Sequence, residues 1–253
     1  MVVAVRPLQE TYMKTVVPPE KAFCSWSGGK DSCLALDHAQ RTGYDVAVLL
    51  NMLAEDGEYS RSHGLRKSML ESQADAMGKE ILFGQATWDD YERVFLERLA
   101  LLKSQGFTAG VFGDIDVEAH REWVDRVCRT VGLKAFLPLW NKDRETLLND
   151  FLSSGYCATI VSVREEALGR EWLGRHLDRN AVEAFRTAGI DLSGENGEYH
   201  TFVSDGPIFR KPVLFRTGKT QAIQGYAFVE LLLNRGGGNH PRKFKHDRDY
   251  DRF

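Results

Sequence analysis

The sequence has few cysteines, and none of them forms a metal-binding pair. Its 253 residues include only Cys24, Cys33, Cys128 and Cys157, and no two of these are separated by two residues. Zinc ribbons, iron–sulfur clusters and thioredoxin-type sites use such close pairs, so the spacing argues against all three. We interpret Cys24 and Cys33, which flank a glycine-rich segment, as small apolar packing residues.

Long apolar runs and an excess of basic charge are also lacking. No apolar run approaches the roughly 18 residues that a membrane-spanning helix needs. The apolar residues 2–5 are followed at once by Arg6 and Pro7, not by a signal-peptide core. The formal net charge of -3 argues against broad binding of nucleic acid. We therefore expect a cytoplasmic protein without membrane contact or a strong nucleic-acid signal; a homo-oligomer is compatible with this sequence.

The composition is that of an ordinary globular protein, with 43% hydrophobic and 27% charged residues. Short apolar strands alternate with helices in the first half of the chain. We predict strands at 22–26, 45–52, 80–83, 108–112 and 134–137, and helices at 31–42, 63–77, 88–105 and 117–131. This alternation predicts an α/β fold with a doubly wound, Rossmann-type parallel sheet over residues 21–137.

The pattern changes near residue 138, where we expect a smaller α+β domain to begin. It would cover residues 138–234, with a helix at 142–154, a strand at 156–163, two short helices within 168–189, and strands at 212–215 and 222–233 that pair through a turn near residues 217–219. The polar residues 55–62 are interpreted as a mobile loop. Residues 1–20 are expected to form an N-terminal arm, and residues 235–253 a disordered tail.

The segment from Ser27 to Ser32 (SGGKDS) is the most informative part of the chain. It joins a predicted strand to a predicted helix, and its two glycines allow a tight turn with exposed N–H groups. Such a turn at the positive end of a helix dipole is an anion site suited to phosphates. The spacing is not that of a Walker A loop. Lys30 would pair with a phosphate oxygen or remain solvated; Asp31 would hold Mg²⁺, cap the helix, or do both.

Other polar residues fall at the same predicted edge of the sheet. Asn51 ends the second strand, and Gly113 and Asp114 follow the fourth. Ligands of doubly wound sheets bind at the carboxyl ends of the strands, so we assign these three residues to the nucleotide site with the 27–32 segment. The carboxylates of Asp114 and Asp116 would suit a ribose hydroxyl or a magnesium ion, or would cap the next helix.

A second polar segment lies between residues 194 and 201. It consists of Gly194, Glu195, Asn196, Gly197, Glu198, Tyr199, His200 and Thr201. Two acids, a histidine and two glycines are expensive to bury, so the segment is either a solvated turn or part of a site. The apolar residues that follow would fix it firmly, and we favour a substrate-binding role. Glu198 and His200 would serve general acid–base chemistry or orient an amine.

The segments at 27–32 and 194–207 (GENGEYHTFVSDGP) together resemble the diphthine–ammonia ligase family. This family is a branch of the PP-loop N-type ATP pyrophosphatases, in the adenine nucleotide α-hydrolase superfamily with its HUP-like fold. The resemblance covers roughly residues 22–215. Further shared features are His63–Leu65, Gln73–Ala74, His120–Arg121, Pro138–Trp140 and Trp172–Arg175.

The resemblance implies an ATP-dependent ligase that forms AMP and pyrophosphate, with ATP and Mg²⁺ as cofactors. It would adenylate a carboxylate, that of diphthine on elongation factor 2 or of a related acid, and ammonia would displace AMP. Carried over by residue, the pyrophosphate cradle would be Ser27, Gly28, Gly29, Asp31 and Ser32, and residues 194–201 would lie near the acceptor. The catalytic set would be Lys30, Asp31, Glu198 and His200. No N-terminal cysteine offers a glutaminase nucleophile, so we expect free ammonia as the nitrogen source.

Two other functions stay open at this point. A PP-loop RNA-modifying enzyme would require a basic face or cysteine pairs for sulfur transfer, and neither is evident. A non-enzymatic sensor of adenine nucleotides would not require the segment at 194–201 or the second domain. The acceptor itself does not follow from the sequence.

Overall fold

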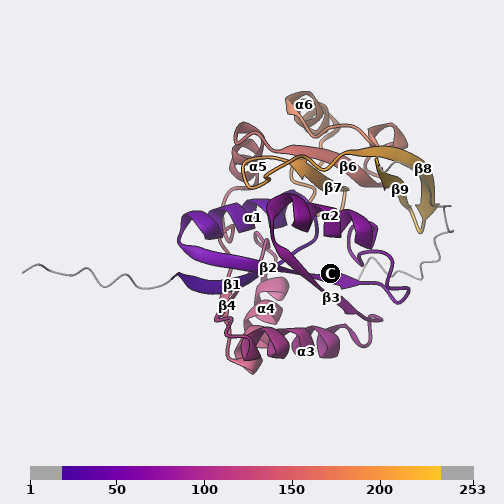
Figure 1. Ribbon diagram of the computed structural model, residues 1–253. Coiled ribbons are helices and arrows are strands. Elements are labelled where there is room, and N and C mark those ends of the chain that lie inside the picture. The colour runs from indigo at the N-terminus through magenta and orange to yellow at the C-terminus, as the bar shows by residue number, and fades with distance from the viewer. Residues whose placement is uncertain (1–18, 235–253) are drawn as a thin grey trace, which may run out of the picture.

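The computed structural model describes residues 19–234, which form two sheets with helices packed on them (Figure 1). The first sheet has the strand order β3-β2-β1-β4-β5, and all its neighbouring strands are parallel. Its strands are β1 (Glu20–Ser25), β2 (Tyr44–Leu53), β3 (Glu80–Gln85), β4 (Ala109–Val111) and β5 (Lys134–Phe136). The expected arm and tail lie outside the described residues, except that Glu20 already belongs to β1.

Helices cover both faces of this parallel sheet. They are α1 (Lys30–Arg41), α2 (Lys67–Met77), α3 (Tyr91–Ser104) and α4 (Glu118–Val131). The buried residues of α1 and α2 belong to one hydrophobic cluster and those of α3 and α4 to another, which places the two pairs on opposite faces. The predicted doubly wound α/β fold is confirmed.

The second sheet is antiparallel, with the order β7-β6-β9-β8. Its strands are β6 (Cys157–Arg164), β7 (Tyr199–Asp205), β8 (Phe215–Ile223) and β9 (Tyr226–Leu233). The helices of this half of the chain are α5 (Arg144–Ser153), the 3₁₀ helix η1 (Arg170–Trp172) and α6 (Arg179–Ala188).

The predicted turn at 217–219 is wrong. Those residues lie inside β8, where the pairing with β9 shifts between Thr217 and Thr220, so Gly218 marks a bulge. The hairpin turns at Gln224 and Gly225, whose φ values are 50° and 80°.

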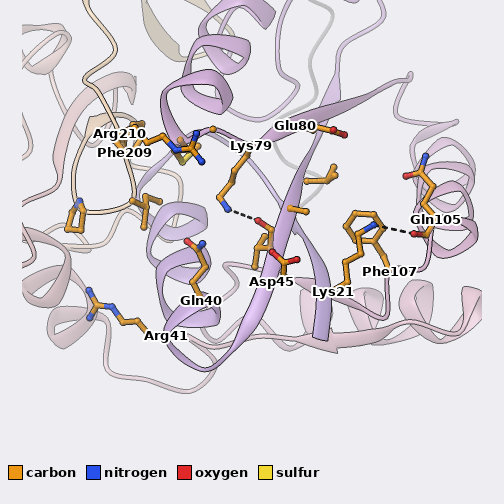
Figure 2. A pocket seen from close by; sticks show the side chains of 17 residues that line it. Lys21, Gln40, Arg41, Asp45, Lys79, Glu80, Gln105, Phe107, Phe209 and Arg210 are labelled. Atoms are coloured by element: carbon orange, nitrogen blue, oxygen red, sulfur yellow. Dashed lines mark hydrogen bonds between the residues drawn. The ribbon is translucent and has the colours of Figure 1, made fainter. Parts of the chain in front are cut away.

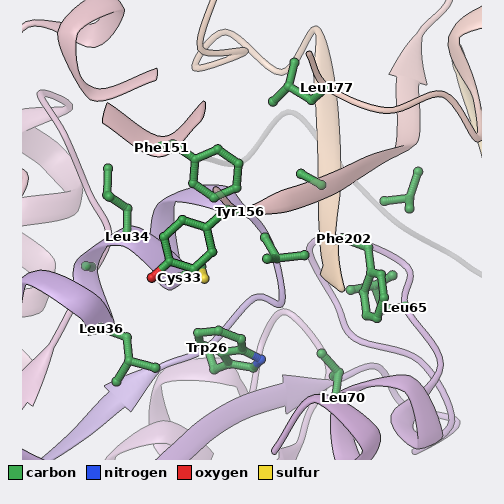
Figure 3. Packing of buried hydrophobic residues seen from close by; sticks show 14 of the residues in the cluster. Trp26, Cys33, Leu34, Leu36, Leu65, Leu70, Phe151, Tyr156, Leu177 and Phe202 are labelled. Carbon is green, nitrogen blue, oxygen red and sulfur yellow. The ribbon is translucent and has the colours of Figure 1, made fainter. Parts of the chain in front are cut away.

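One hydrophobic core joins the two sheets (Figure 3). Trp26, at the end of β1, and Leu36 of α1 share it with Phe151 of α5 and Phe202 of β7. Tyr156 stacks on Phe151 with ring centroids 5.0 Å apart. The shared core fixes β7 against the end of β1. The division into an ATP-binding part at 21–137 and an acceptor-binding part at 138–234 stays a prediction.

The polar segment at 55–62, which the sequence analysis interprets as a mobile loop, has buried residues and backbone contacts. Ser60 and Arg61 are buried, and Ser60 and Tyr59 form isolated β-bridges with Leu53 and Arg66. The side chain of Asp56 accepts hydrogen bonds from the main chain of residues 58 and 59. The Asp56 bonds form a local turn, and the backbone bridge between Ser60 and Leu53 joins the segment to the end of β2.

Candidate active site

The segment at 27–32, hereafter the phosphate loop, is held in place by its glycines and serines. Gly28 has φ +86°, and a Cβ on it would lie 2.8–2.9 Å from the side chains of Leu65, Gln73 and Leu70. Only glycine therefore fits there. The hydroxyl of Ser32 donates to the carbonyl oxygen of Gly29 and lies 3.1 Å from that of Ser27.

No side chain of the phosphate loop caps the start of α1. Gly29 occupies the N-cap position and has no side chain that could accept a hydrogen bond from the helix. The alternative reading of Asp31 and Ser32 as simple caps is thus not what the structure shows. The main-chain N–H of Lys30 donates to Oγ1 of Thr201 at 3.1 Å. This end of the helix dipole points into a polar site, as an anion site requires.

Lys30 places a buried cation at the loop. Its Nζ lies 2.8 Å from Oδ2 of Asp31 and 3.8 Å from Oε1 of Glu195. Burial alone would lower the pKa of Lys30, but the carboxylate of Asp31, together with Tyr199 and Glu195, outweighs burial and leaves this pKa raised. Lys30 is therefore charged near neutral pH, which a phosphate partner requires.

Asn51 and Gly113 support the loop from neighbouring strands. The side chain of Asn51 is buried, and its Nδ2 donates to the carbonyl oxygen of Trp26 at 2.6 Å. Within residues 19–234, its Oδ1 has no hydrogen-bond partner. A Cβ on Gly113 would lie 2.9 Å from main-chain atoms of Asp31 and Ser32, so the end of β4 closely approaches the start of α1. Both residues position the loop from the predicted edge of the sheet.

The carboxylates that follow β4 have side-chain partners. Oδ1 of Asp114 lies 3.1 Å from Nδ1 of His120, and this hydrogen bond, opposed by burial, raises the pKa of His120. Asp116 pairs with Arg144 at 2.6 Å, and Arg144 also pairs with Asp191. Arg144 therefore ties the end of β4 to the chain that leads into residues 194–201.

Residues 194–201, the signature segment, lie against the phosphate loop. Besides the bond from Lys30 to Thr201, the N–H of Val203 donates to the carbonyl oxygen of Gly28 at 3.0 Å. Nε2 of Gln73 donates to the carbonyl oxygens of Gly28 and Val203 and so bridges them. The two segments that carry the family resemblance thus form one site, although more than 160 residues separate them in the sequence.

Glu198 and Glu195 have different environments. Glu198 is buried, and its carboxylate accepts hydrogen bonds from the main chain and side chain of Asn196, both at 3.1 Å, and from the N–H of Asp191 at 3.4 Å. The side chain of Glu195 is 18% exposed and faces Lys30. Burial and the charge of Asp31, offset in part by Lys30, raise the pKa of Glu195 to about 7. Both carboxylate oxygens of Glu198 are thus hydrogen-bonded inside the turn, whereas the carboxyl group of Glu195 faces the phosphate loop.

His63 is a site residue to which sequence reasoning gave no role. Its ring lies on the phosphate loop, because a Cβ on Gly29 would be 2.4 Å from its Cε1. Burial, and to a smaller extent the charge of Lys30, lowers the pKa of His63 to about 4. The sequence feature that could have pointed to His63 is the motif at 63–65, one of those on which the family resemblance in the sequence analysis rests. His200 of the signature segment stacks on His63, with ring centroids 4.5 Å apart.

We expect the low pKa of His63 to make stability depend on pH. The folded protein holds this imidazole neutral down to about pH 4, whereas the unfolded chain protonates it near 6.5. Between these values the unfolded state binds more protons, so the free energy of unfolding should fall as the pH is lowered. Chemical denaturation at several pH values measures this slope. The slope should be smaller in His63→Asn, and an equal slope in both proteins would contradict the assignment.

The phosphate loop fits a magnesium-bound nucleotide. It offers the start of α1, the Lys30 cation and the carboxylate of Asp31. Over residues 19–234, no group of three His, Cys, Asp or Glu side chains is arranged as a metal site. A nucleotide-bound Mg²⁺ needs only one or two carboxylates beside its phosphates, so Asp31 suits that ion.

A cavity of about 1070 Å³ lies at the opposite edge of the parallel sheet (Figure 2). Its lining includes Lys21, Asp45 and Glu80, at the amino ends of β1, β2 and β3, and Arg210. No residue that the sequence analysis assigned to the site lines it. The phosphate loop therefore lies outside this cavity.

Family models and relatives agree on what the chain resembles. The model of the diphthamide synthase N-terminal domain matches residues 20–135, and that of the diphthamide synthase C-terminal domain matches residues 143–231. A diphthine–ammonia ligase of Schizosaccharomyces pombe is 30% identical over 210 residues, which are 74% of this chain but 35% of that protein. Diphthine–ammonia ligases of Bos taurus and Homo sapiens are each 27% identical over 236 residues, covering 83% of this chain and 88% of theirs.

One solved structure is similar to part of this chain. It is the crystal structure of a predicted subunit of tRNA methyltransferase from Methanocaldococcus jannaschii, with a TM-score of 0.41 and 15% sequence identity. The match covers 76% of this chain and all of that one. None of the helices between residues 19 and 234 is long and apolar enough to cross a membrane.

Proposed function

The chain belongs to the diphthine–ammonia ligase family, with its two diphthamide synthase domains, and on this basis we propose that it is an ATP-dependent, AMP-forming carboxylate–ammonia ligase. The observation that carries the proposal is the contact between the phosphate loop and the signature segment. Lys30 belongs to the phosphate loop and contacts the signature segment twice. Its N–H donates to Thr201, and its ammonium group lies beside Glu195. Lys30 would thus belong both to the site that binds the phosphates and to the site that binds the carboxylate to be amidated.

The chemistry needs such a shared site. A carboxylate is a poor electrophile towards ammonia, and converting it to an acyl-adenylate supplies a leaving group. Preorganised positive charge then stabilises the charge that develops on the departing pyrophosphate. Lys30 and the start of α1 supply that charge from the protein, and Mg²⁺ held by Asp31 would neutralise phosphate oxygens. Ser27, Gly28, Gly29 and Ser32 would form the cradle, and Asn51 and Gly113 would position it.

The remaining residues would serve the ribose, the acceptor and the amine. Asp114, oriented by His120, suits a ribose hydroxyl. Glu195 would receive a proton from the incoming ammonium, while Glu198 would hold the turn that presents it. The names of the relatives indicate diphthine and ammonia as substrates of those proteins. For this chain we propose diphthine on elongation factor 2, or a chemically related acid.

The products of ATP cleavage test this proposal. With acceptor acid, ammonium and Mg²⁺ present, the nucleotide products should be AMP and pyrophosphate, because the cut falls at the α–β bond. Chromatography of the nucleotides and a coupled pyrophosphate assay measure both products. Lys30→Met is the control and should lose about 10²–10³-fold in turnover. Formation of ADP and phosphate alone would contradict the assignment.

A further inference from the structure

Two stacked histidines lie beside the phosphate loop, and the reaction proposed in the preceding subsection uses neither, although the sequence analysis placed His200 in the catalytic set. His63 precedes α2 and His200 belongs to β7; their ring planes are inclined by 27° at a centroid separation of 4.5 Å. The ring of His63 packs directly on Gly29, where a Cβ would be only 2.4 Å from its Cε1. An imidazole therefore forms one wall of the loop that would hold the phosphates.

The hydrogen bonds of His63 determine its tautomer. Its Nδ1 lies 3.1 Å from the carbonyl oxygen of Thr201, and a carbonyl oxygen can only accept, so Nδ1 carries the proton. Nε2 of the neutral ring then has a free lone pair, and no hydrogen-bond partner for it occurs in the described part of the chain. The ring nitrogens of His200 likewise have no hydrogen-bond partner between residues 19 and 234. Each ring can thus accept a proton.

Burial, aided by the charge of Lys30, keeps both rings neutral in the free protein. Lys30 of α1 is the cation that faces them, and burial together with Lys30 and the neighbouring imidazole lowers the pKa of His200 well below its usual value. Asp31 and Glu195 lie beside the ammonium group of Lys30. A bound triphosphate would bring several negative charges to the loop and reverse the sign of this local field. An opposite charge within a few ångströms stabilises an imidazolium.

We propose that the His63–His200 pair takes up one proton when the phosphates of ATP occupy the loop, and that this charge helps to hold pyrophosphate until it leaves. The inference rests on the proposed function. The proton comes from the solvent and binds to a ring nitrogen with a free lone pair, Nε2 in the case of His63. It returns to the solvent when pyrophosphate dissociates. The stacked rings share a single positive charge, because two charges at this separation would repel.

Calorimetry with the non-cleavable analogue α,β-methylene-ATP tests the proposal. With Mg²⁺ in excess, so that the nucleotide itself does not titrate, binding is measured in two buffers that differ in ionisation enthalpy. The wild-type protein should take up close to one proton per nucleotide at neutral pH. Its Kd should rise with pH, by up to tenfold per unit between the free and the bound pKa, because the bound state holds the extra proton.

Two matched variants assign the proton. His63→Asn keeps an N–H donor near the Nδ1 position, and therefore the bond to Thr201, but it does not titrate. Proton uptake should be lost in this variant or in the double variant His63→Asn/His200→Asn. It should persist in Glu195→Gln, which removes a carboxyl group beside Lys30 whose pKa is raised to about 7.

The outcomes separate this inference from the proposed function. Binding of the analogue without proton uptake would overturn the histidine proposal and leave the ligase assignment standing. Uptake that survives in the double variant, or disappears in Glu195→Gln alone, would also overturn it. Absence of any binding would overturn both. If His63→Asn does not fold, the Cε1–H NMR signals of the wild-type histidines, titrated with and without the analogue, give the same answer.

Discussion

Gly29→Val is expected to weaken ATP binding by at least about 100-fold, or about 2.7 kcal/mol, in a protein that still folds. The backbone of Gly29 is ordinary, with φ -97°, so the expected effect comes from space and not from conformation. The first added carbon would lie 2.4 Å from the ring of His63 and 3.1 Å from the carbonyl oxygen of Thr201. Valine would therefore push the signature segment and the imidazole away from the loop. Titration calorimetry with α,β-methylene-ATP measures the loss.

A second substitution identifies the cause of the Gly29 effect. Gly29→Ala should weaken binding less than valine does. It should also cost less affinity in a His63→Ala protein than in the wild type, because the ring that the new methyl group meets is then absent. Circular dichroism and the melting temperature show whether each variant is folded. Unchanged affinity in Gly29→Val would mean that the nucleotide does not bind at this loop.

The sequence predicts the order of elements around the loop because local signals determine it. Apolar strands of four to eight residues, amphipathic helices and glycine stops recur from residue 21 to residue 137, and each signal depends only on its neighbours. The same local reasoning fails where a glycine has two possible uses. Gly218 resembles a turn residue, but it lies in a bulge of β8, because β9 supplies the pairing that extends the strand across it.

The roles within the site depend on contacts that the sequence does not contain. Glu195 and Glu198 are two acids in one short polar segment, and nothing local shows which one turns inward. The structure separates them because Gly194 and Gly197 have φ values of 72° and 78°, which fold the chain around the carboxylate of Glu198. His63 joins the site through a contact with Thr201, 138 residues away. Long-range packing of this kind has no periodicity that could reveal it.

Glu195→Gln and Glu198→Gln are therefore expected to fail in different ways. The side chain of Glu195 faces Lys30 and makes none of the hydrogen bonds that hold the turn. Its substitution should leave the melting temperature and ATP affinity nearly unchanged. It should lower acceptor-dependent formation of AMP and amide by about 10²–10⁴-fold, the usual cost of losing a general acid–base group.

Glu198→Gln should instead destabilise the protein. A glutamine amide has one acceptor oxygen where the carboxylate has two, so one of the three donors from Asn196 and Asp191 would lose its partner inside the turn. An unsatisfied buried donor costs about 1–3 kcal/mol, which for a chain of this size lowers the melting temperature by about 2–10 °C. Activity should fall only as far as the turn is disturbed.

Thermal unfolding, calorimetry with the ATP analogue and a turnover assay on the two variants show which acid has the catalytic role. A stable Glu198→Gln protein with a 10²-fold or larger loss of turnover would return the catalytic role to Glu198, and loss of ATP binding in both variants would place the signature segment in the nucleotide site itself.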